Sequence, residues 1–409
     1  MKHSGADSKA HEDIMERREK TMRPVFAALL TGVLIYGLAM GTSYPLLGIA
    51  LAGTVSDAWN GVSIAATGLG LMAGVGLMPA VMRRIGAGAT AVLGVAIMAA
   101  SLCALSSTQE FWLIFVYRLL LGVGSNLMFV VTETGLNVLS DPRQRGQLFG
   151  LYSMLSGVGF VAGPSLVAYA PGEANVLLLI CSGVAVIAIL PFFAVRKTLS
   201  AHITPSERAR YLPSIRALPF AFVLLAIASA VDAVSIGLLP VIGMRSGFTA
   251  AEGAIFVTLF HLGLVCGQPA VGWLLDIWGR RRTILACILV SFAATGFLAL
   301  GGAENYAISI GLMFCWGAAN FGLYTAGLTL IGDRFSGIAL SAATGSFALV
   351  YALAAIVAPA LSGLSLDAFH ASGFYALTGL IYFAAFGWAL YKFRPLEPAL
   401  AFGGRETET

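Results

Sequence analysis

Charged residues are scarce in this sequence. Asp, Glu, Lys and Arg make up 11% of its 409 residues, and 58% of the residues are apolar. A soluble domain usually carries about 25% charged residues. The 24 basic and 20 acidic side chains are too few to cover a soluble fold of this length. A water-soluble globular protein is therefore excluded, and the lipid bilayer must be the main solvent.

Cysteine and catalytic motifs are also sparse. The five cysteines lie inside apolar runs and show no CxxC spacing, so they predict neither a disulfide framework nor a zinc site. We interpret them as packing residues; they are Cys103, Cys181, Cys266, Cys287 and Cys315. The sequence has no phosphate-binding P-loop, no HExxH and no nucleophile elbow. We therefore expect no enzymatic activity, no cofactor and no metal.

Long apolar runs make up most of the sequence. A membrane-spanning helix needs about 20 apolar residues, and such runs are separated here by charged or turn-forming breaks. They are rich in Gly and Ala, as close-packed membrane helices often are. The pattern predicts an all-α membrane protein with twelve transmembrane helices near 24–46, 58–80, 86–107, 111–135, 147–170, 175–195, 217–241, 252–275, 283–302, 306–330, 340–364 and 372–391.

The basic residues predict the orientation of these spans. With both termini in the cytoplasm, 22 of the 24 Lys and Arg residues fall on the inner side, as the positive-inside rule requires. The exceptions are Arg118, inside span four, and Arg245 in an outer loop, while other outer loops carry acids such as Asp57 and Asp367. Because the net charge of +4 follows topology, we expect a bilayer and no nucleic acid as the partner.

The spans divide into two halves. The polar stretch 196–216 contains two prolines and five basic residues and is predicted to link them. We expect a cytoplasmic N-terminal segment at 1–23, six-helix bundles at 24–195 and 217–391, a central cytoplasmic loop at 196–216 and a cytoplasmic tail at 392–409.

The two halves resemble each other. Pro24, Pro45 and Gly48 recur 195 residues later as Pro219, Pro240 and Gly243, and the stretch 163–166 recurs as 358–361 at the same offset. Agreement of several spans on one offset indicates a parallel duplication, which is a known architecture of transporters.

A tight turn is predicted between spans eight and nine. The run 272–282 reads Gly-Trp-Leu-Leu-Asp-Ile-Trp-Gly-Arg-Arg-Arg. Gly279 permits a backbone bend, Gly272 permits close helix approach, and Asp276 can pair with a nearby arginine or cap a helix. We assign Gly272, Asp276, Gly279, Arg280 and Arg281 to a cytoplasmic gate motif; the alternative is a basic loop that serves topology alone.

This run closely resembles the loop signature of the major facilitator superfamily. The stretch 114–124, which contains Arg118, resembles the fourth-helix motif of that family, and Gly159-x3-Gly163-Pro164 resembles its antiporter-associated motif, which we expect to bend a helix. The resemblance covers the whole chain. It implies two pseudo-symmetric six-helix bundles, alternating access about a site near the membrane midplane, and a functional monomer.

The first half departs from the family pattern. Arg83 stands where the second half has Asp276, and the Arg83–Arg84 pair replaces the basic triplet. If this loop still forms a latch, Glu133 or Asp141 is the nearest candidate for its acidic partner. The glycine pair that usually follows the antiporter motif is also missing, which leaves the direction of transport open.

Four ionisable residues lie within the predicted spans. A charge at membrane depth costs at least about 2.5–3.5 kcal/mol, so each is a functional candidate. Asp232, midway along span seven, is the expected proton or substrate site, with a hydrogen-bonded structural acid as the alternative. Arg118 is expected to hold an anionic or carbonyl group or to pair with an acid, and the alternative is that its side chain snorkels toward the outer face. Glu133 is expected to be a latch partner, a proton site or a solvated residue. His261 is a histidine that titrates near neutral pH, and it has either a functional role or a packing role.

Polar and aromatic residues are expected to line the substrate cavity, because spans one, four, seven and ten line it in the family. Trp316, Asn320 and Tyr324 share one helical face, and such a face suits a flat, partly polar organic solute; packing is the alternative. The full set of predicted cavity residues is Tyr36, Met40, Tyr44, Asn126, Ser235, Trp316, Asn320 and Tyr324.

Together these features predict a secondary active transporter of the bacterial cytoplasmic (inner) membrane. We expect it to move a small organic solute with protons as the coupling ion, because nothing in the chain hydrolyses nucleotides. Efflux by antiport is narrowly favoured over proton-coupled uptake by symport of a vitamin-like planar metabolite, for example a riboflavin-like solute. A transport-inactive membrane sensor or scaffold is the alternative from another class.

Overall fold

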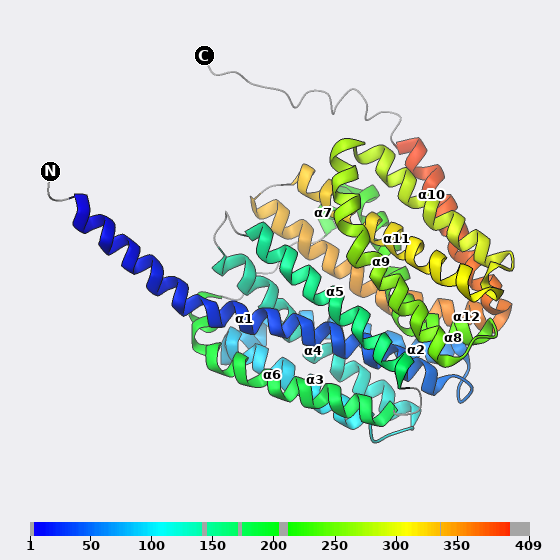
Figure 1. Cartoon of the computed structure of the whole chain (residues 1–409), viewed down its shortest axis with the longest axis horizontal. Coiled ribbons are helices and arrows are strands. Elements are labelled where there is room, and N and C mark those ends of the chain that lie inside the picture. The colour runs from blue at the N-terminus through cyan, green and yellow to red at the C-terminus, as the bar shows by residue number, and fades with distance from the viewer. Residues whose placement is uncertain (1–3, 141–144, 171–173, 204–211, 336, 393–409) are drawn as a thin grey trace, which may run out of the picture. The chain divides into compact units, whose positions relative to one another are not determined.

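The computed structural model describes residues 4–140, 145–170, 174–203, 212–335 and 337–392, and these residues are almost entirely helical (Figure 1). No strand of a sheet occurs among them. The helices are α1 (Ser4–Leu51), α2 (Asp57–Ile85), α3 (Ala87–Leu105), α4 (Phe111–Leu139), α5 (Arg145–Tyr169), α6 (Ala174–His202), α7 (Leu212–Ala217), α8 (Pro219–Arg245), α9 (Ala250–Ile277), α10 (Arg280–Ala299), the 3-10 turn η1 (Gly302–Glu304), α11 (Tyr306–Arg334) and α12 (Gly337–Lys392).

Eleven of the described helices are long and apolar enough to cross a membrane, and the length of the last of these fits two spans. Its apolar part, Gly345–Lys392, has 48 residues. At 1.5 Å per residue that length is roughly 72 Å, more than twice the bilayer core of about 30 Å. His370, with φ 58° and ψ −167°, breaks the helix inside this part. The twelve predicted spans are therefore all present as helices.

Local sequence signals account for the helix starts. Thr249 caps α9 by accepting a hydrogen bond from the Glu252 backbone N–H, and the Glu252 side chain accepts one from the Thr249 backbone N–H in return. Asn305 caps α11 in a similar way through the Ile308 backbone N–H. Pro219 stands at the start of α8, where a missing N–H costs nothing.

The duplication inferred from sequence reappears in backbone geometry. The turn before α3 holds Gly86 at φ 80° and ψ 161°, and the turn before α10 holds Gly279 at φ 81° and ψ 158°. In each turn the threonine four residues later, Thr90 or Thr283, donates its hydroxyl to the glycine carbonyl. Only glycine adopts a positive φ without strain. The same type of turn therefore occurs in both halves, 193 residues apart.

The chain forms two compact units that do not coincide with the two sequence halves. Unit 1 comprises 1–43, 66–166 and 172–207, and unit 2 comprises 44–65, 167–171 and 208–409. The end of α1 and the start of α2 therefore belong to unit 2. The boundaries of the two predicted bundles stay a prediction.

In unit 1, α1 and α5 approach each other through glycines. A Cβ added at Gly159 would lie 2.6 Å from the Leu38 backbone nitrogen, and one at Gly163 would lie 2.4 Å from the Gly41 carbonyl carbon. Such distances leave no room for a side chain. The stretch that resembles the antiporter motif, including Pro164 inside α5, is therefore a close helix-packing element.

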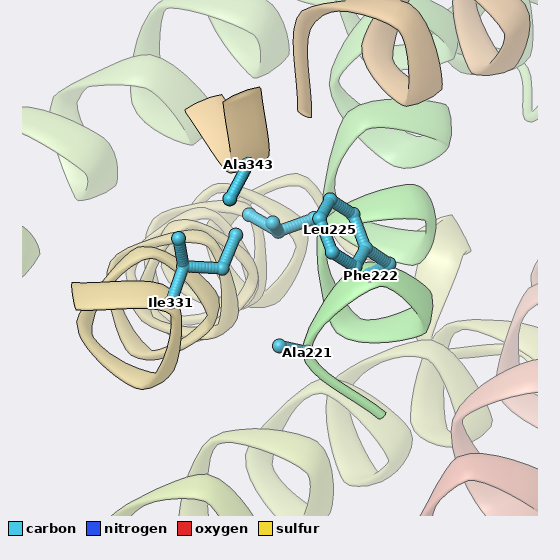
Figure 2. Packing of buried hydrophobic residues seen from close by; sticks show 5 residues of the cluster. All are labelled: Ala221, Phe222, Leu225, Ile331 and Ala343. Atoms are coloured by element: carbon cyan, nitrogen blue, oxygen red, sulfur yellow. The ribbon is translucent and has the colours of Figure 1, made fainter. Parts of the chain in front are cut away.

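In unit 2, an apolar cluster joins the first turns of α8 to the end of α11 and the start of α12. Figure 2 shows its five buried members, which are Ala221, Phe222, Leu225, Ile331 and Ala343. Tyr324, predicted to line the cavity, packs against this cluster and meets Phe347 with ring centroids 5.2 Å apart.

Part of the predicted central loop is helical. Helix α6 continues to His202, beyond the predicted end at 195, and α7 occupies 212–217. The extension is anchored because the Ser200 hydroxyl accepts a hydrogen bond from the Gly88 backbone N–H at 3.0 Å, at the start of α3. The middle of that loop, most of the tail at 393–409 and the candidate latch acid Asp141 lie outside the described residues.

Candidate functional site

The strongest polar cluster in the membrane-spanning part of unit 2 is built around Asp232. This residue lies at the midpoint of α8. Tyr351 on α12 donates its hydroxyl to Asp232 Oδ2 at 2.6 Å, and His261 Nε2 on α9 lies 3.4 Å from Asp232 Oδ1. The Asp232 side chain keeps 17% of its surface exposed, whereas His261 keeps 1%. Three helices thus bring an acid, an imidazole and a phenol together, and we name them the triad.

The hydrogen bond of His261 to the main chain indicates which ring nitrogen faces Asp232 without a hydrogen in the neutral imidazole. Its Nδ1 is 2.9 Å from the Val257 carbonyl oxygen, and a carbonyl can only accept, so Nδ1 carries a hydrogen. The other nitrogen, Nε2, faces the carboxylate oxygen Oδ1. Two bare lone pairs at this distance would repel each other, so an attractive contact needs one proton between Asp232 and His261. The distance of 3.4 Å makes it a loose electrostatic contact rather than a short hydrogen bond.

The Tyr351 bond is short. Hydrogen bonds from a hydroxyl to a carboxylate measure about 2.5–2.7 Å, and the 2.6 Å separation lies in that range. On the other side of the pair, the rings of Phe260 and Phe321 flank His261 at centroid distances of 5.6 and 5.9 Å.

The equivalent position in the other half has no acid. By the offset of 195 residues, Asp232 corresponds to Gly37 and Tyr351 corresponds to Ser156. A Cβ added at Gly37 would lie 2.5 Å from the Ser156 carbonyl oxygen. One copy of the duplicated contact is thus close backbone packing, and the other is a hydrogen-bonded acid. The triad is a specialisation of one half rather than a consequence of the fold.

Two predicted cavity residues of α11 lie in a buried hydrogen-bond chain of unit 2. Trp316 Nε1 donates to the Tyr382 hydroxyl at 3.0 Å, this hydroxyl donates to Asn320 Oδ1 at 2.8 Å, and Asn320 Nδ2 donates to the Ala228 carbonyl at 3.1 Å. The Trp316, Asn320 and Tyr382 side chains are completely buried. This arrangement joins α11 to α8 and α12 and favours the packing interpretation of Trp316 and Asn320.

The remaining predicted cavity residues fall into both units. Tyr36, Met40 and Asn126 belong to unit 1, whereas Tyr44 and Ser235 belong to unit 2. Tyr36 is half-buried and the other four are buried. Ser235 donates its hydroxyl to the Val231 carbonyl within α8 at 2.6 Å. A Cβ at Gly74 would touch the Asn126 side chain at 2.6 Å, so α2 packs directly on it.

Arg118 is enclosed within unit 1. Its side chain is 1% exposed, although it lies only seven residues into α4. Its helix contacts α2 closely, since a Cβ at Gly122 would lie 2.2 Å from the Thr67 carbonyl oxygen, and one at Gly124 would lie 2.6 Å from the Gly94 oxygen on α3. The glycines of the fourth-helix stretch therefore serve helix packing around this arginine. Arg118 and Glu133 lie 15 residues apart, toward opposite ends of α4.

Glu133 lies near the other end of α4. Tyr152 on α5 donates its hydroxyl to Glu133 Oε1 at 3.2 Å. Arg83 and Arg84 are exposed at the end of α2, and neither makes an ion pair with a described acid. The structure thus gives Glu133 a phenol partner rather than the predicted latch partner.

The predicted turn after α9 forms a compact ion-pair network. Arg280 donates to Asp333 Oδ2 at 3.1 Å, to Asp276 Oδ1 at 3.3 Å and to the Leu275 carbonyl at 2.9 Å. Asp276 thus pairs with an arginine, one of its two expected roles. A Cβ added at Gly272 would meet nothing within 4 Å, so the expected close helix approach at Gly272 is absent, and Arg281 is half-buried beside this turn.

We expect Arg280 and Asp333 to be coupled energetically. Arg280→Ala and Asp333→Asn should each lower the apparent melting temperature of the detergent-purified protein, and the double variant should lose less than the sum of the two. A partly exposed pair of this kind is worth about 0.2–1 kcal/mol. Arg282→Ala, at an exposed residue of the same basic triplet, is the control and should have little effect. Additive losses would show that the pair contributes nothing.

A second charged cluster joins helix ends that the positive-inside assignment puts on the outer side. Asp57 at the start of α2 pairs with Arg245 at the end of α8, with Oδ2 3.0 Å from Nε. The Asp367 carboxylate on α12 accepts hydrogen bonds at 2.9 Å from the Asp57 and Ala58 backbone N–H groups. An acid at a helix N-terminus satisfies unpaired donors there. The cluster is contained in unit 2.

Sequence reasoning missed three tyrosines that complete these sites. Tyr351 holds Asp232, Tyr152 holds Glu133, and Tyr382 links Trp316 to Asn320. For Tyr351 the duplication offset gives only its counterpart Ser156; that Ser156 contacts the Gly37 position is known from the structure. For Tyr152 and Tyr382 nothing in the spacing identifies the partner.

Comparison with known proteins agrees with this architecture. The family model of the Major Facilitator Superfamily matches residues 29–340 and 221–408. The uncharacterized MFS-type transporter YfkF of Bacillus subtilis (strain 168) is 26% identical over 360 residues, which cover 86% of this chain and 92% of that protein. The uncharacterized MFS-type transporter YcaD of Shigella flexneri serotype 5b (strain 8401) is 26% identical over 353 residues, which cover 85% and 90%.

Solved structures show the same fold at lower identity. A point mutant of the nucleoside transporter NupG matches with a TM-score of 0.74 at 12% identity, over 90% of this chain and 100% of that one. A bacterial homolog of the human lysosomal transporter Spinster matches with a TM-score of 0.68 at 15% identity, over 91% and 98%. The predicted twelve-span, two-bundle fold class is therefore confirmed. The chain belongs to the Major Facilitator Superfamily and is a multi-pass membrane transporter.

Proposed function

We propose that this transporter is coupled to protons and that the triad carries the coupling proton. The observation that supports this most directly is the contact between Asp232 and His261, which is attractive only when the pair holds one proton. An acid at the midpoint of a spanning helix is costly unless it serves a purpose. The partial exposure of Asp232 allows proton exchange, whereas buried His261 supplies a fixed partner.

Loss of the proton changes the forces within the triad. The neutral imidazole would then point a lone pair at Oδ1 of the carboxylate, so their contact becomes repulsive. Tyr351 keeps its bond to Oδ2, which leaves Asp232 attached to α12 but not to α9. The protonation state therefore decides whether α8 and α9 are held together at this level, which is a physical link between proton binding and helix movement.

We propose a small organic solute as the transported substrate, and exchange of that solute against protons as the direction. The α1–α5 packing element supports antiport through its resemblance to the antiporter-associated motif. Symport of a planar solute is the second candidate, because the glycine pair that usually follows the antiporter motif is missing. NupG, a nucleoside transporter, shares the fold, so nucleosides are among the planar solutes to test. Both candidates use the cytoplasmic membrane with both termini inside and a functional monomer, as the distribution of basic residues and the family predict.

Flux measurements in sealed vesicles test this proposal. The purified full-length protein is reconstituted with a pH-sensitive dye inside, a pH gradient is imposed, and nucleosides, flavins and organic amines are added one at a time. We expect at least one solute to dissipate the gradient only in vesicles that contain the protein. The direction of proton movement relative to solute movement then distinguishes antiport from symport.

Two outcomes would contradict the proposal. Solute movement that is indifferent to the pH gradient would remove the assignment of protons as coupling ion. Absence of movement for every solute, in protein shown to be folded by its thermal unfolding, would favour the alternative of a membrane sensor.

A further inference from the structure

A second acidic site lies in unit 1, and a row of aromatic rings leads away from it. Glu133 on α4 accepts a hydrogen bond from the Tyr152 hydroxyl, and the Tyr152 ring lies 6.1 Å from that of Phe129, one helical turn before Glu133. Tyr36 on α1 meets Phe129 at 5.1 Å and Phe160 on α5 at 5.9 Å between ring centroids. Three helices therefore contribute one carboxylate and four aromatic rings in successive contact, and we name these five residues the aromatic acid site.

The site is accessible in part. Tyr36, Phe129, Glu133 and Phe160 are half-buried, and only Tyr152 is buried. The acid and three of the rings thus keep surface that a ligand can contact. A closed core would bury these large side chains completely, as it does at Tyr375 and Trp316 in unit 2.

Among the residues that the structure describes, no basic side chain compensates the charge of Glu133. Its one hydrogen bond to a described residue comes from the neutral phenol of Tyr152, and it forms no ion pair with any described basic residue. Removing an ion from water without an opposite charge is unfavourable. A bound cation would supply the missing charge directly.

The neighbouring rings narrow the class of that cation. Aromatic faces attract cations through their quadrupoles at distances up to about 6 Å, and the attraction grows when the cation is desolvated. A metal ion needs several oxygen, nitrogen or sulfur ligands, and the described residues contain no group of three His, Cys, Asp or Glu that could hold one. An organic anion would be repelled by the carboxylate.

We propose that the aromatic acid site binds an organic cation, an ammonium-type or similar positive centre carrying apolar substituents. Glu133 neutralises the charge, and the rings of Tyr36, Phe129 and Phe160 contact the substituents. The site belongs to unit 1 and shares no residue with the triad, which belongs to unit 2, so ligand binding here goes beyond the proposed proton coupling and can be tested without it.

Equilibrium binding of two ions of matched shape tests the charge selectivity. Tetraphenylphosphonium and tetraphenylborate have the same arrangement of four phenyl rings and opposite charges. With full-length protein in detergent and radiolabelled ions, we expect tetraphenylphosphonium to bind at least tenfold more tightly than tetraphenylborate. No pH gradient is present, so failure here is distinguishable from failure of the proton proposal.

Substitutions identify the site. Glu133→Gln should weaken tetraphenylphosphonium binding at least tenfold without changing tetraphenylborate binding, and Glu133→Asp should retain most of it. Glu304→Gln, the same change at an exposed residue of η1, is the matched control and should bind as the wild type does. Phe129→Leu should weaken cation binding several-fold, and it decides the question if Glu133→Gln does not fold.

The proposal is overturned by either of two results. Equal affinity for the two ions would show that the site recognises apolar surface alone. Unchanged cation affinity in a folded Glu133→Gln protein, or in Phe129→Leu where the former does not fold, would place the binding elsewhere.

Discussion

Asp232→Asn is expected to reduce proton-driven solute flux to the level of empty vesicles. The amide cannot take up and release a proton in the physiological range, so the exchangeable proton of the triad disappears. The shape of the side chain is retained. Its oxygen can still accept the Tyr351 hydroxyl, and its NH2 can donate to His261 Nε2 in place of the shared proton. The measurement is the change in internal pH when a transported solute is added to reconstituted protein.

Companion variants separate coupling from folding. Asp232→Glu keeps a titratable group and should retain part of the flux, while Tyr351→Phe removes the 2.6 Å bond and should shift the pH dependence of transport. Asp232→Asn should also keep solute exchange in the absence of a gradient, because the solute pathway remains. Full proton-driven flux in a folded Asp232→Asn protein would contradict the role of the triad.

The predictability of this protein differs between its fold and its site. Apolar runs long enough to cross a bilayer predict helices by themselves, because lipid offers backbone groups no other hydrogen-bonding partner. The placement of charged residues predicts the orientation of the spans, and the repeated Pro and Gly positions predict their division into two related halves. The helix ends were less predictable, since α6 continues past 195 to His202 where an unforeseen hydrogen bond between Gly88 and Ser200 holds it.

The site could be predicted one residue at a time but not as a set. The cost of burying a charge singles out Asp232, Arg118 and Glu133 from sequence alone. Which residues face them depends on helix rotation, which sequence spacing does not determine. Asp232 and His261 were separate candidates, and their contact at 3.4 Å is a result of the way α8 and α9 pack. Likewise, a shared face predicted Trp316 and Asn320 as a pair but not their burial against Tyr382.

Gly317→Val is expected to prevent α9 and α11 from packing and to destabilise the protein more than any other substitution considered. A Cβ added at Gly317 would lie 1.9 Å from the Phe260 carbonyl oxygen, far inside contact distance. This neighbour is backbone, which cannot move aside as a flexible side chain can. Ordinary overpacking costs about 1–3 kcal/mol, and we expect Gly317→Val to exceed that range. Phe260 also precedes His261, so separation of the helices would displace the triad.

Gly311→Val on the same helix is the matched control. A Cβ at Gly311 would meet nothing within 4 Å, and the change in helix propensity is the same at both positions. The apparent melting temperature in detergent, measured at one scan rate because membrane proteins often unfold irreversibly, should fall strongly for Gly317→Val and little for Gly311→Val. Similar melting temperatures for the two variants would mean that α9 and α11 do not approach as closely at Gly317 as described, and the position of His261 beside Asp232 would lose its structural support.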